Sequence, residues 1–334
     1  MTSTNQPMVT LVVAMRNEEG SIEACLGSIE AQDYNPACLQ VIVVDGESTD
    51  RSRDLAANIV ARHPTWRLVD NPKRIQAAAW NLGIEMASGE VIGIVSGHAE
   101  LAPDYVNAAV ETLARTEAAM VGGPVTPLGT GPVPVAIGAA LSSPFGVGGA
   151  RHHYLDAEAQ TDTVFMGLAP RGIFRAFRFD ETMVRNQDDE LSYRLIDAGH
   201  AIVCNPAIRS RYRVRPSIGA LARQFWAYGY WKVAVLRRHP RRAKPRHLLP
   251  AMVVAGLAVL TPLALVSGRA RTLLVLGSLP YLALDTALAA RHARREGALS
   301  GIALAVIFPT MHGSYGAGFA KGLWDALGER RRRA

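Results

Sequence analysis

The sequence contains little cysteine. Three cysteines, Cys25, Cys38 and Cys204, occur among 334 residues, and no two of them form a C-x-x-C pair. An odd number of widely spaced cysteines argues against both a disulfide framework and a zinc site, so we expect reduced thiols. Charged residues make up 19% of the chain and hydrophobic residues 49%, which excludes a disordered chain and predicts a large core.

The N-terminus lacks the pattern of a secretory signal. Its first residues, MTSTNQPMVT, contain neither a basic segment nor the apolar run that follows such a segment in signal peptides. We therefore expect the bulk of the protein to stay in the cytosol.

Acidic residues are absent from Ala198 to Leu284. The first half of this stretch is basic, and its cations are Arg209, Arg211, Arg213, Arg215, Arg223, Lys232, Arg237, Arg238, Arg241, Arg242, Lys244 and Arg246. The aromatic residues interleaved between Phe225 and Trp231 would suit nucleic acid, with phosphates on the cations and bases stacked on the rings. The residues that follow favour a membrane instead.

Two long apolar runs follow the basic stretch. Leu248–Gly268 is uncharged and long enough to cross a bilayer core about 30 Å thick, and a second run begins at Thr272 and contains only Asp285 as a charge. Joined by the short GRAR, the runs predict a membrane hairpin, and basic residues on both outer flanks predict that these flanks and the preceding domain are cytoplasmic. We expect a cytosolic domain at 1–235 and a membrane region at 236–334, with spans near 248–267 and 272–290.

A third apolar segment, near 299–320, is ambiguous. It contains Pro309, His312 and four glycines, and the basic tail GERRRRA follows it. These residues favour a broken, re-entrant or interfacial helix, because a full crossing would carry the basic tail outside. A complete third span is the alternative. The simplest explanation of the basic flanks is attraction to anionic lipid.

Apolar runs alternate with helical patterns in the first hundred residues. The runs MVTLVVAM, LQVIVVDG, WRLVDN and GEVIGIVS are separated by amphipathic segments with helical spacing. Ser48 or Thr49 is the expected N-cap of the second helix. This alternation predicts an α/β domain with a mostly parallel sheet covered on both faces. Ligands of such sheets bind beyond the carboxyl ends of the strands.

Polar residues cluster where the four runs stop. They are Arg16, Asn17, Glu18 and Glu19; Asp45, Glu47, Ser48 and Asp50; Asp70, Asn71, Lys73 and Arg74; and Ser96, His98 and Glu100. Each of them alone has a simpler explanation as a helix cap, a turn residue or a solvated charge. Four such strand ends at one edge of a sheet favour a binding site.

Four stretches resemble the successive signatures of family 2 glycosyltransferases, which are nucleotide-sugar-dependent enzymes with the GT-A fold. They are VTLVVAMRNEE, VIVVDGESTDRS, AAAWNLGIEMASGEVI and NQDDELSYRL, and the resemblance covers about Val9 to Lys232. Within the family, SPFGVGGAR, RQFWAYGYWK and HGSYGAGF are similar to the membrane-attached enzymes of succinoglycan-type exopolysaccharide synthesis. The resemblance implies a GT-A-type nucleotide-sugar-binding domain followed by a C-terminal α-helical membrane region.

The resemblance also implies a divalent metal cofactor, Mn or Mg, at the end of the fourth strand. Family members usually carry Asp-x-Asp there, where this chain has Ser96-Gly97-His98. His98 is therefore the expected metal ligand, as a neutral imidazole. Ser96 offers a hydroxyl without charge. A loop imidazole without a ligand, or compensation by Glu100, is the alternative.

The same resemblance assigns the catalytic base to Asp188. Sugar transfer needs a group that takes the proton of the acceptor hydroxyl and cations that stabilise the leaving diphosphate. The family's Glu-Asp pair falls on Gln187-Asp188, so the first carboxylate is replaced by an amide. Asp189 is the second choice, whereas Glu190 and Arg194 have the spacing of a charged helix face. A single displacement with one base inverts the anomeric centre.

The remaining site residues follow by resemblance. The expected donor-binding residues are Arg16, Asn17, Glu18, Asp45, Ser48, Lys73, Arg74 and Ser96. The expected residues on the acceptor and diphosphate side are Gln187, Gln224, Trp226, Tyr228, Trp231 and Lys232. For the aromatic members of the second group, an interfacial aromatic belt is the alternative.

The expected function is inverting transfer of a sugar from a nucleotide-diphospho-sugar of the UDP type to a polyprenyl-diphosphate-linked saccharide, in surface or extracellular polysaccharide synthesis at the cell membrane. Expected partners are the donor, the lipid-linked acceptor, membrane lipid and polysaccharide-assembly proteins, and nucleic acid is not expected. The altered metal motif and acidic pair leave an inactive membrane scaffold as an alternative. A membrane-tethered polyanion binder is less favoured and would show salt-sensitive binding.

Overall fold

The structure is a computed structural model that describes residues 6–148, 150 and 153–333. The chain forms two compact units. The first comprises Met1–Thr126 and Arg151–Arg213, and the second comprises Pro127–Ala150 and Val214–Ala334. The expected boundary between a cytosolic and a membrane region at residue 235 does not coincide with the boundaries of these units. The expected division stays a prediction.

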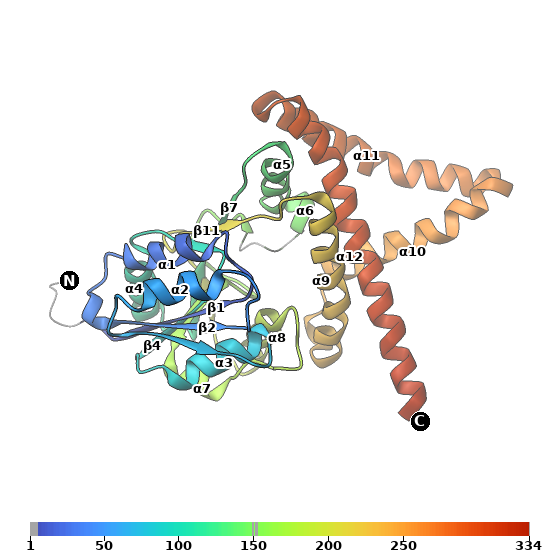
Figure 1. The fold of residues 1–334 in the computed structure, drawn as a ribbon. Coiled ribbons are helices and arrows are strands. Elements are labelled where there is room, and N and C mark those ends of the chain that lie inside the picture. The colour runs from blue at the N-terminus through green and yellow to red at the C-terminus, as the bar shows by residue number, and fades with distance from the viewer. Residues whose placement is uncertain (1–5, 149, 151–152, 334) are drawn as a thin grey trace. The chain divides into compact units, whose positions relative to one another are not determined.

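The first unit is built on an eight-stranded sheet with the order β3-β2-β1-β4-β9-β6-β10-β8 (Figure 1). The first four strands in this order are parallel, whereas β9 runs antiparallel to β4 and β6. The expectation of a mostly parallel α/β sheet is confirmed. The strands are β1 (Val9–Met15), β2 (Leu39–Asp45), β3 (Trp66–Asp70), β4 (Val91–Ser96), β6 (Met120–Gly123), β8 (Ala159–Gln160), β9 (Phe165–Pro170) and β10 (Ile202–Cys204).

A second, three-stranded sheet has the order β5-β11-β7. Its strands are β5 (Ala99–Leu101), β7 (Val125–Leu128) and β11 (Ser210–Arg213). Tyr212 of β11 pairs with Ala99 of β5, and the β5 strand begins directly after His98. The small sheet therefore flanks the end of β4, where a metal ligand is expected.

Both faces of the main sheet are buried, as the apolar runs predict. In β1, Leu11 and Val13 belong to one core cluster, whereas Val12 and Ala14 belong to a cluster on the opposite face. Alternation of side chains along a strand produces this division. The helices of this unit are α1 (Ile22–Glu30), α2 (Ser52–Val60), α3 (Gln76–Met86), α4 (Tyr105–Thr116), α7 (Arg171–Ala176) and α8 (Gln187–Asp197).

The cysteines are free thiols, as expected. Burial raises the pKa of the Cys25 thiol to about 12, so this group stays protonated at neutral pH. The expected cap of α2 is wrong. The helix begins at Ser52 with Arg51 as its N-cap, and the Ser48 hydroxyl instead donates to the Asp45 carboxylate at 2.6 Å.

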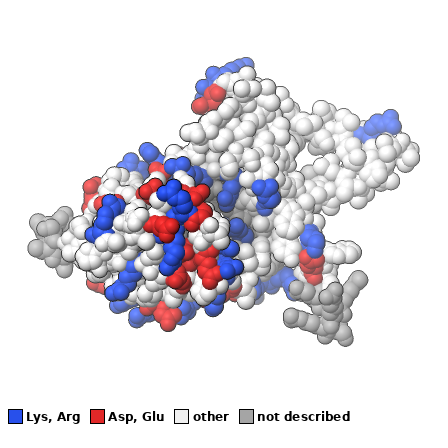
Figure 2. All heavy atoms as spheres, viewed as in Figure 1, with Lys and Arg blue, Asp and Glu red and all other residues white. Residues whose placement is uncertain are grey.

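The second unit is helical, and its three longest helices are apolar enough to cross a membrane by length and composition. These candidate spans are Pro245–Val266, Gly268–Glu296 and Ala298–Gly328. Large apolar side chains such as Met252, Leu273 and Leu299 are exposed on them, and Figure 2 shows that their visible surface is mostly uncharged. The helices of the unit are α5 (Pro132–Leu141), α6 (Pro144–Val147), α9 (Ile218–Arg238), α10 (Pro245–Val266), α11 (Gly268–Glu296) and α12 (Ala298–Arg333).

Two details of the membrane region differ from expectation. The GRAR segment is the start of α11 rather than a loop, because the Ser267 hydroxyl caps the helix by accepting from the Ala270 amide at 3.3 Å. The third apolar segment is one continuous helix, α12, which passes through Pro309 and the glycines without a break. A broken helix is therefore wrong, whereas a third span and a re-entrant or interfacial helix stay predictions.

The glycines of α12 serve close packing against α9. A Cβ on Gly318 would lie 2.0 Å from the Trp226 carbonyl oxygen, and a Cβ on Gly229 would lie 2.0 Å from the Tyr315 carbonyl oxygen. Such contacts require glycine, which lets two helix backbones approach closely. Gly318, one of the glycines that suggested a break, and Gly229 thus let RQFWAYGYWK of α9 pack against HGSYGAGF of α12.

A polar contact also links α6, α11 and α12. The Tyr281 hydroxyl lies 2.8 Å from His312 Nδ1, and His312 Nε2 lies 3.0 Å from the Phe145 carbonyl oxygen. A polar side chain within an apolar helix is stabilised by such partners, because an unpaired one would be costly in lipid. The described part of SPFGVGGAR is therefore tied to HGSYGAGF; Gly149 and Arg151 of that motif lie outside the described residues.

We predict that Gly318→Ala lowers the stability of the full chain in detergent, because its Cβ would overlap the α9 backbone. Overpacking of this kind costs about 1–3 kcal/mol. The control is Gly313→Ala in the same helix, where a Cβ would meet nothing within 4 Å. There the higher helix propensity of Ala should stabilise by up to about 1 kcal/mol. Thermal unfolding of purified protein checks the pair, and equal shifts for both variants would contradict close packing at Gly318.

Candidate active site

The loops after β1 and β2 are held together by hydrogen bonds at the carboxyl edge of the sheet. The Asn17 backbone N–H donates to the Ser48 hydroxyl at 2.9 Å, and the Thr49 backbone N–H donates to the side-chain oxygen Oδ1 of Asn17 at 2.8 Å. The Glu18 amide donates to the Ser52 hydroxyl at 2.6 Å. Asn17, Glu18 and Ser48, three of the expected donor-binding residues, therefore lie together.

Asp45 organises the second of these loops from a buried position. Its side chain is 1% exposed, accepts from both the amide and the hydroxyl of Ser48, and lies 3.5 Å from an Arg53 guanidinium nitrogen. Next to it, the Arg16 side chain covers Gly46, at which a Cβ would come within 3.2 Å of Arg16 Cδ. Asp45 and Arg16 thus adjoin the same loop pair, and their contact with a donor stays a prediction.

Left-handed backbone conformations gather at this edge. Six non-glycine residues among those described have positive φ, and four of them are Asn17, Glu47, Arg74 and Asn186. The first three follow β1, β2 and β3, and Asn186 is the N-cap of α8. Such conformations are costly for residues with a Cβ and concentrate at functional sites.

Lys73 and Arg74, two cations among the expected donor-binding residues, are each paired with a carboxylate. Lys73 Nζ donates to Glu181 Oε2 at 2.5 Å, and Arg74 Nε donates to Glu47 Oε2 at 2.6 Å. Asn81 Nδ2 also donates to Glu181, at 3.0 Å. This hydrogen bond and the Lys73 ammonium hold the pKa of Glu181 below its usual value. The sequence pattern did not identify Glu181 or Asn81, because neither follows a strand.

His98 is paired with Glu18. Its Nδ1 lies 2.9 Å from Glu18 Oε1, and its ring meets the Tyr212 ring edge-on at 5.4 Å. No group of three His, Cys, Asp or Glu side chains suited to a metal is found in the described part of the chain. An imidazole and a carboxylate are nevertheless a fitting partial donor set for a divalent ion, since oxygen atoms of a bound diphosphate could complete its coordination.

Ser96 and Gln187 are connected through Gln76. Gln187 Nε2 donates to Gln76 Oε1 at 2.7 Å, and Gln76 Nε2 donates to the Ser96 hydroxyl at 3.3 Å. The sequence did not single out Gln76, which is the first residue of α3. Two of the positions that depart from the family pattern, Ser96 and Gln187, are thus linked by hydrogen bonds in the structure.

The three acids at the start of α8 differ in environment. Asp188 is exposed, and its Oδ1 accepts from the Asp189 amide at 3.0 Å. Glu190 is 3% exposed and pairs with Arg194 at 2.9 Å. The helix-face pair of Glu190 and Arg194 is as expected, so Asp188 is better placed than Glu190 to meet a substrate.

The remaining acceptor-side candidates belong to the second unit and lie on α9. Gln224 accepts from Arg215 Nε at 3.1 Å and donates to the Tyr228 hydroxyl at 2.8 Å. The ring of Trp226, 41% exposed, stacks on Tyr230 with centroids 5.3 Å apart. Lys232 is buried.

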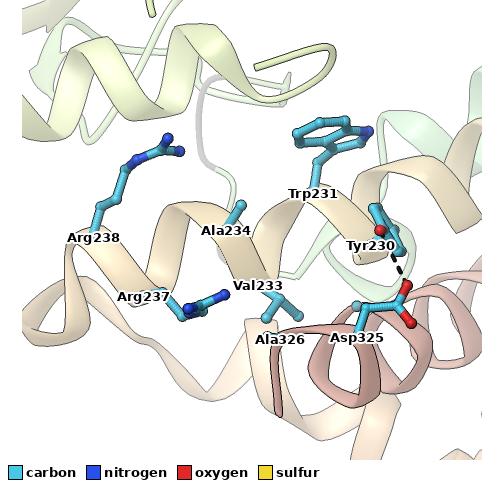
Figure 3. A pocket seen from close by; sticks show the side chains of 9 residues that line it. Tyr230, Trp231, Val233, Ala234, Arg237, Arg238, Asp325 and Ala326 are labelled. Atoms are coloured by element: carbon cyan, nitrogen blue, oxygen red, sulfur yellow. Dashed lines mark hydrogen bonds between the residues drawn. The ribbon is translucent and has the colours of Figure 1, made fainter. Parts of the chain in front are cut away.

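A pocket of about 440 Å³ lies between α9 and α12 (Figure 3). Its lining residues are Tyr230, Trp231, Val233, Ala234, Arg237, Arg238, Gly322, Asp325 and Ala326. The Tyr230 hydroxyl donates to Asp325 at 3.2 Å, and Lys321 pairs with the same carboxylate at 2.5 Å. Arg237 and Arg238 stand at the other end of the pocket. Trp231 is the acceptor-side candidate that contributes to this lining.

A mostly parallel sheet with a polar strand-end site, followed by long apolar helices, is the architecture of a GT-A-like α/β domain with candidate membrane helices. Its fold is similar to that of a mannosyltransferase, PcManGT, from Pyrobaculum calidifontis, solved in complex with GDP-Man and Mn2+. The TM-score is 0.67 at 22% identity, covering 97% of this chain and 89% of the other. This likeness concerns the fold.

Sequence comparisons give the family. Residues 10–164 match the profile of glycosyl transferase family 2. The succinoglycan biosynthesis protein ExoA of Rhizobium meliloti is 29% identical over 318 residues, or 94% of both chains. A Methanococcus voltae enzyme, dolichyl N-acetyl-alpha-D-glucosaminyl phosphate 3-beta-D-2,3-diacetamido-2,3-dideoxy-beta-D-glucuronosyltransferase, is 27% identical over 69% of this chain and 74% of its own. The chain therefore contains a family 2 glycosyltransferase domain at residues 10–164 and is similar to these relatives.

We predict that Glu181→Gln lowers stability at neutral pH and has a smaller effect in acid. Because the folded-state pKa of Glu181 lies below its ordinary value of 4.5, its contribution is complete above pH 4.5 and is lost as the pH falls through the folded pKa. A loss of about 1 kcal/mol corresponds to about 2–4 °C in melting temperature. Thermal unfolding at pH 7 and at pH 4 measures the difference.

The control for this experiment is Glu85→Gln. Glu85 pairs with Arg178 at 3.2 Å on an exposed surface, and such pairs contribute little. A Glu181→Gln effect that is the same at both pH values would contradict the assignment of its stabilising role to the charged carboxylate.

Proposed function

We propose that this glycosyltransferase moves a sugar from a nucleotide-diphospho-sugar of the UDP type to a polyprenyl-diphosphate-linked saccharide at the membrane. The observation that carries the proposal is the strand-end site itself. There the interlocked loops of Asn17 and Ser48, the His98–Glu18 pair and the Gln76 link to Gln187 occupy the same edge of the sheet. The relatives in succinoglycan biosynthesis and in transfer to a dolichyl phosphate saccharide support a lipid-linked acceptor.

Asp188 is the base in this proposal. Its carboxylate accepts the proton of the acceptor hydroxyl while the hydroxyl oxygen forms a bond to the anomeric carbon. The bond from that carbon to the phosphate oxygen breaks on the opposite face, and the nucleoside diphosphate leaves with the electron pair. One displacement inverts the anomeric centre, so an α-linked donor gives a β-glycoside. Exposure of Asp188 at the start of α8 is consistent with this role.

The leaving diphosphate requires positive charge. His98 and Glu18 would hold a divalent Mn or Mg ion, which when bound supplies charge that offsets the diphosphate. Lys73 and Arg74 are the cationic side chains that we propose to contact the leaving diphosphate. Each would bind phosphate by exchanging its present partner, Glu181 or Glu47, for the ligand. Asp45, Arg16 and Ser96 complete the donor side.

The membrane helices fit a lipid-linked acceptor. Three candidate spans follow the acid-free basic stretch, and we propose a multi-pass protein of the cell membrane with its domain at 1–235 in the cytosol. Gln224, Trp226, Tyr228, Trp231 and Lys232 lie on α9, directly before the first candidate span in sequence. A bilayer-bound acceptor would meet such a segment at the interface, where aromatic and basic residues are favoured. Polysaccharide-assembly proteins remain expected partners.

We predict that membranes containing the protein release nucleoside diphosphate from one UDP- or GDP-sugar in a panel, provided that polyprenyl-linked lipid extract and Mn or Mg are present. Chelation should abolish release. His98→Ala should reduce it strongly, and Asp188→Asn should reduce it about 10²–10⁴-fold because the general base is lost. Coupled detection of the diphosphate and of the glycosylated lipid measures both products.

Asp189→Asn is the matched control, because it removes a neighbouring carboxylate of the same helix turn. It should leave most of the release intact, and a larger loss than with Asp188→Asn would move the base to Asp189. Full activity on a soluble sugar, with no gain from a lipid carrier, would contradict the lipid-linked acceptor.

A further inference from the structure

A row of neutral polar side chains crosses the candidate site. It consists of Gln187 at the start of α8, Gln76 at the start of α3 and Ser96 at the end of β4. Gln187 is 4% exposed and Ser96 is 6% exposed. Each of the three residues comes from a different element, so the row fixes the distance between the start of α8 and the end of β4.

The hydrogen bonds of this row define how the side-chain amides of Gln76 and Gln187 are oriented. Gln76 donates its nitrogen to the Ser96 hydroxyl, so its oxygen faces Gln187 and accepts from Gln187 Nε2 at 2.7 Å. Gln187 therefore donates from its side-chain nitrogen to Gln76, and its side-chain oxygen remains available as an acceptor. This oxygen, Gln187 Oε1, is buried and has no hydrogen-bond partner among the described residues.

A buried acceptor without a donor is unfavourable. It forfeits its bonds to water without replacement, and such a group typically costs about 1–3 kcal/mol. Turning the Gln187 amide alone would not remove the cost, because it would place Gln187 Oε1 against Gln76 Oε1, and both are acceptors. Turning both amides would let the Ser96 hydroxyl donate to Gln76 but would leave Gln187 Nε2 unpaired, so one polar atom of Gln187 lacks a partner in either case. In the arrangement that the structure shows, this atom is the acceptor oxygen. The arrangement of the row therefore keeps an acceptor in place for a donor group that is supplied from outside the protein.

The neighbours of this oxygen indicate which group that is. Gln187 immediately precedes Asp188, the proposed base, and the other end of the row is Ser96, two residues before His98 on the diphosphate side. The transferred sugar has to lie between the base and the leaving diphosphate, because the acceptor oxygen that the base deprotonates attacks the anomeric carbon from the face opposite the diphosphate. The groups that it carries there are hydroxyls, which donate hydrogen bonds.

We infer that Gln187 Oε1 accepts a hydrogen bond from a hydroxyl of the transferred sugar, and that Gln76 and Ser96 are positioning residues that hold the amide in the accepting orientation. This inference rests on the proposed function, because it needs a sugar donor in the site. It makes Gln187 a specificity-determining residue. A site built to pair with a hydroxyl discriminates against an analogue that lacks it, since the amide oxygen is then left unpaired.

The test is a double-mutant cycle between the protein and the donor. The best donor from the nucleotide-sugar panel is compared with its monodeoxy analogues, using the full chain in membranes and kcat/KM for each pair. In the wild type, one deoxy analogue should be poorer than the parent sugar by about ten-fold or more, as expected for a lost hydrogen bond. With Gln187→Ala, the same analogue and the parent sugar should react equally well.

Three further variants test separately the acceptor oxygen of Gln187 and the partner that orients it. Gln187→Glu keeps an acceptor oxygen and should retain a preference for the parent sugar, whereas Gln187→Met fills the space without an amide and should lose it. Gln76→Leu removes the partner that orients the amide and should reduce the preference without abolishing it. The control is Gln160→Ala, which removes an exposed amide on β8 and should leave the preference unchanged.

Equilibrium binding gives a second readout that does not depend on turnover. Gln187→Ala should weaken binding of the nucleotide sugar by about ten-fold, the factor expected for the lost hydrogen bond. Binding of the free nucleoside diphosphate should be unchanged, which also shows that the variant is folded. Equal losses for both ligands would assign Gln187 a merely structural role and overturn the inference.

The outcomes separate this inference from the proposed function. If the wild type binds and turns over a nucleotide sugar but no deoxy analogue couples to Gln187, the inference is wrong and the function stands. If the wild type binds no nucleotide sugar at all, the proposed function fails and the inference falls with it.

Discussion

The in-register parallel pairing of β1 with β2 and β4 determines where the chemistry of this protein can take place. Met15 pairs with Asp45, Asp45 with Asp70, and Ala14 with Ser96, so the strands end side by side. A shift of one residue would turn every buried side chain to the other face of the sheet. Because both faces are packed, the register is held firmly, and the loops after these strands are brought to one edge.

Local sequence pattern was sufficient for the sheet and its edge but not for the contacts made there. The apolar runs and the polar residues that end them are periodic features that can be read along the chain. The pairing of Lys73 with Glu181 and the link from Gln76 to Gln187 join residues about a hundred positions apart, which leave no periodic trace. The resemblance to a family located Asp188 and His98, whereas Gln76, Asn81 and Glu181 became visible only through side-chain geometry.

The third apolar segment shows a different limit. Glycine lowers helix propensity, so glycines within an apolar run suggest a break. In α12, Gly318 instead meets the α9 backbone, and close packing offsets the loss of propensity. Composition alone cannot separate these cases, because the partner helix, which lies about ninety residues earlier, decides which effect wins. The tight packing of α9 on α12 also gives a structural reason for the glycines of the motifs RQFWAYGYWK and HGSYGAGF.

Charge balance explains why neutral side chains suit the centre of the site. Glu18 already faces His98, Asp45 faces Ser48 and Arg53, and Glu47 faces Arg74. A nucleotide-sugar donor would bring further negative charge to this edge. A carboxylate at Ser96 or Gln187 would add like charge beside Asp188 or the diphosphate and would favour protonation of the base. An amide and a hydroxyl can form hydrogen bonds without that repulsion. Ser96 and Gln187 are therefore electrostatically consistent with each other and with the proposed role of Asp188 as an ionised base.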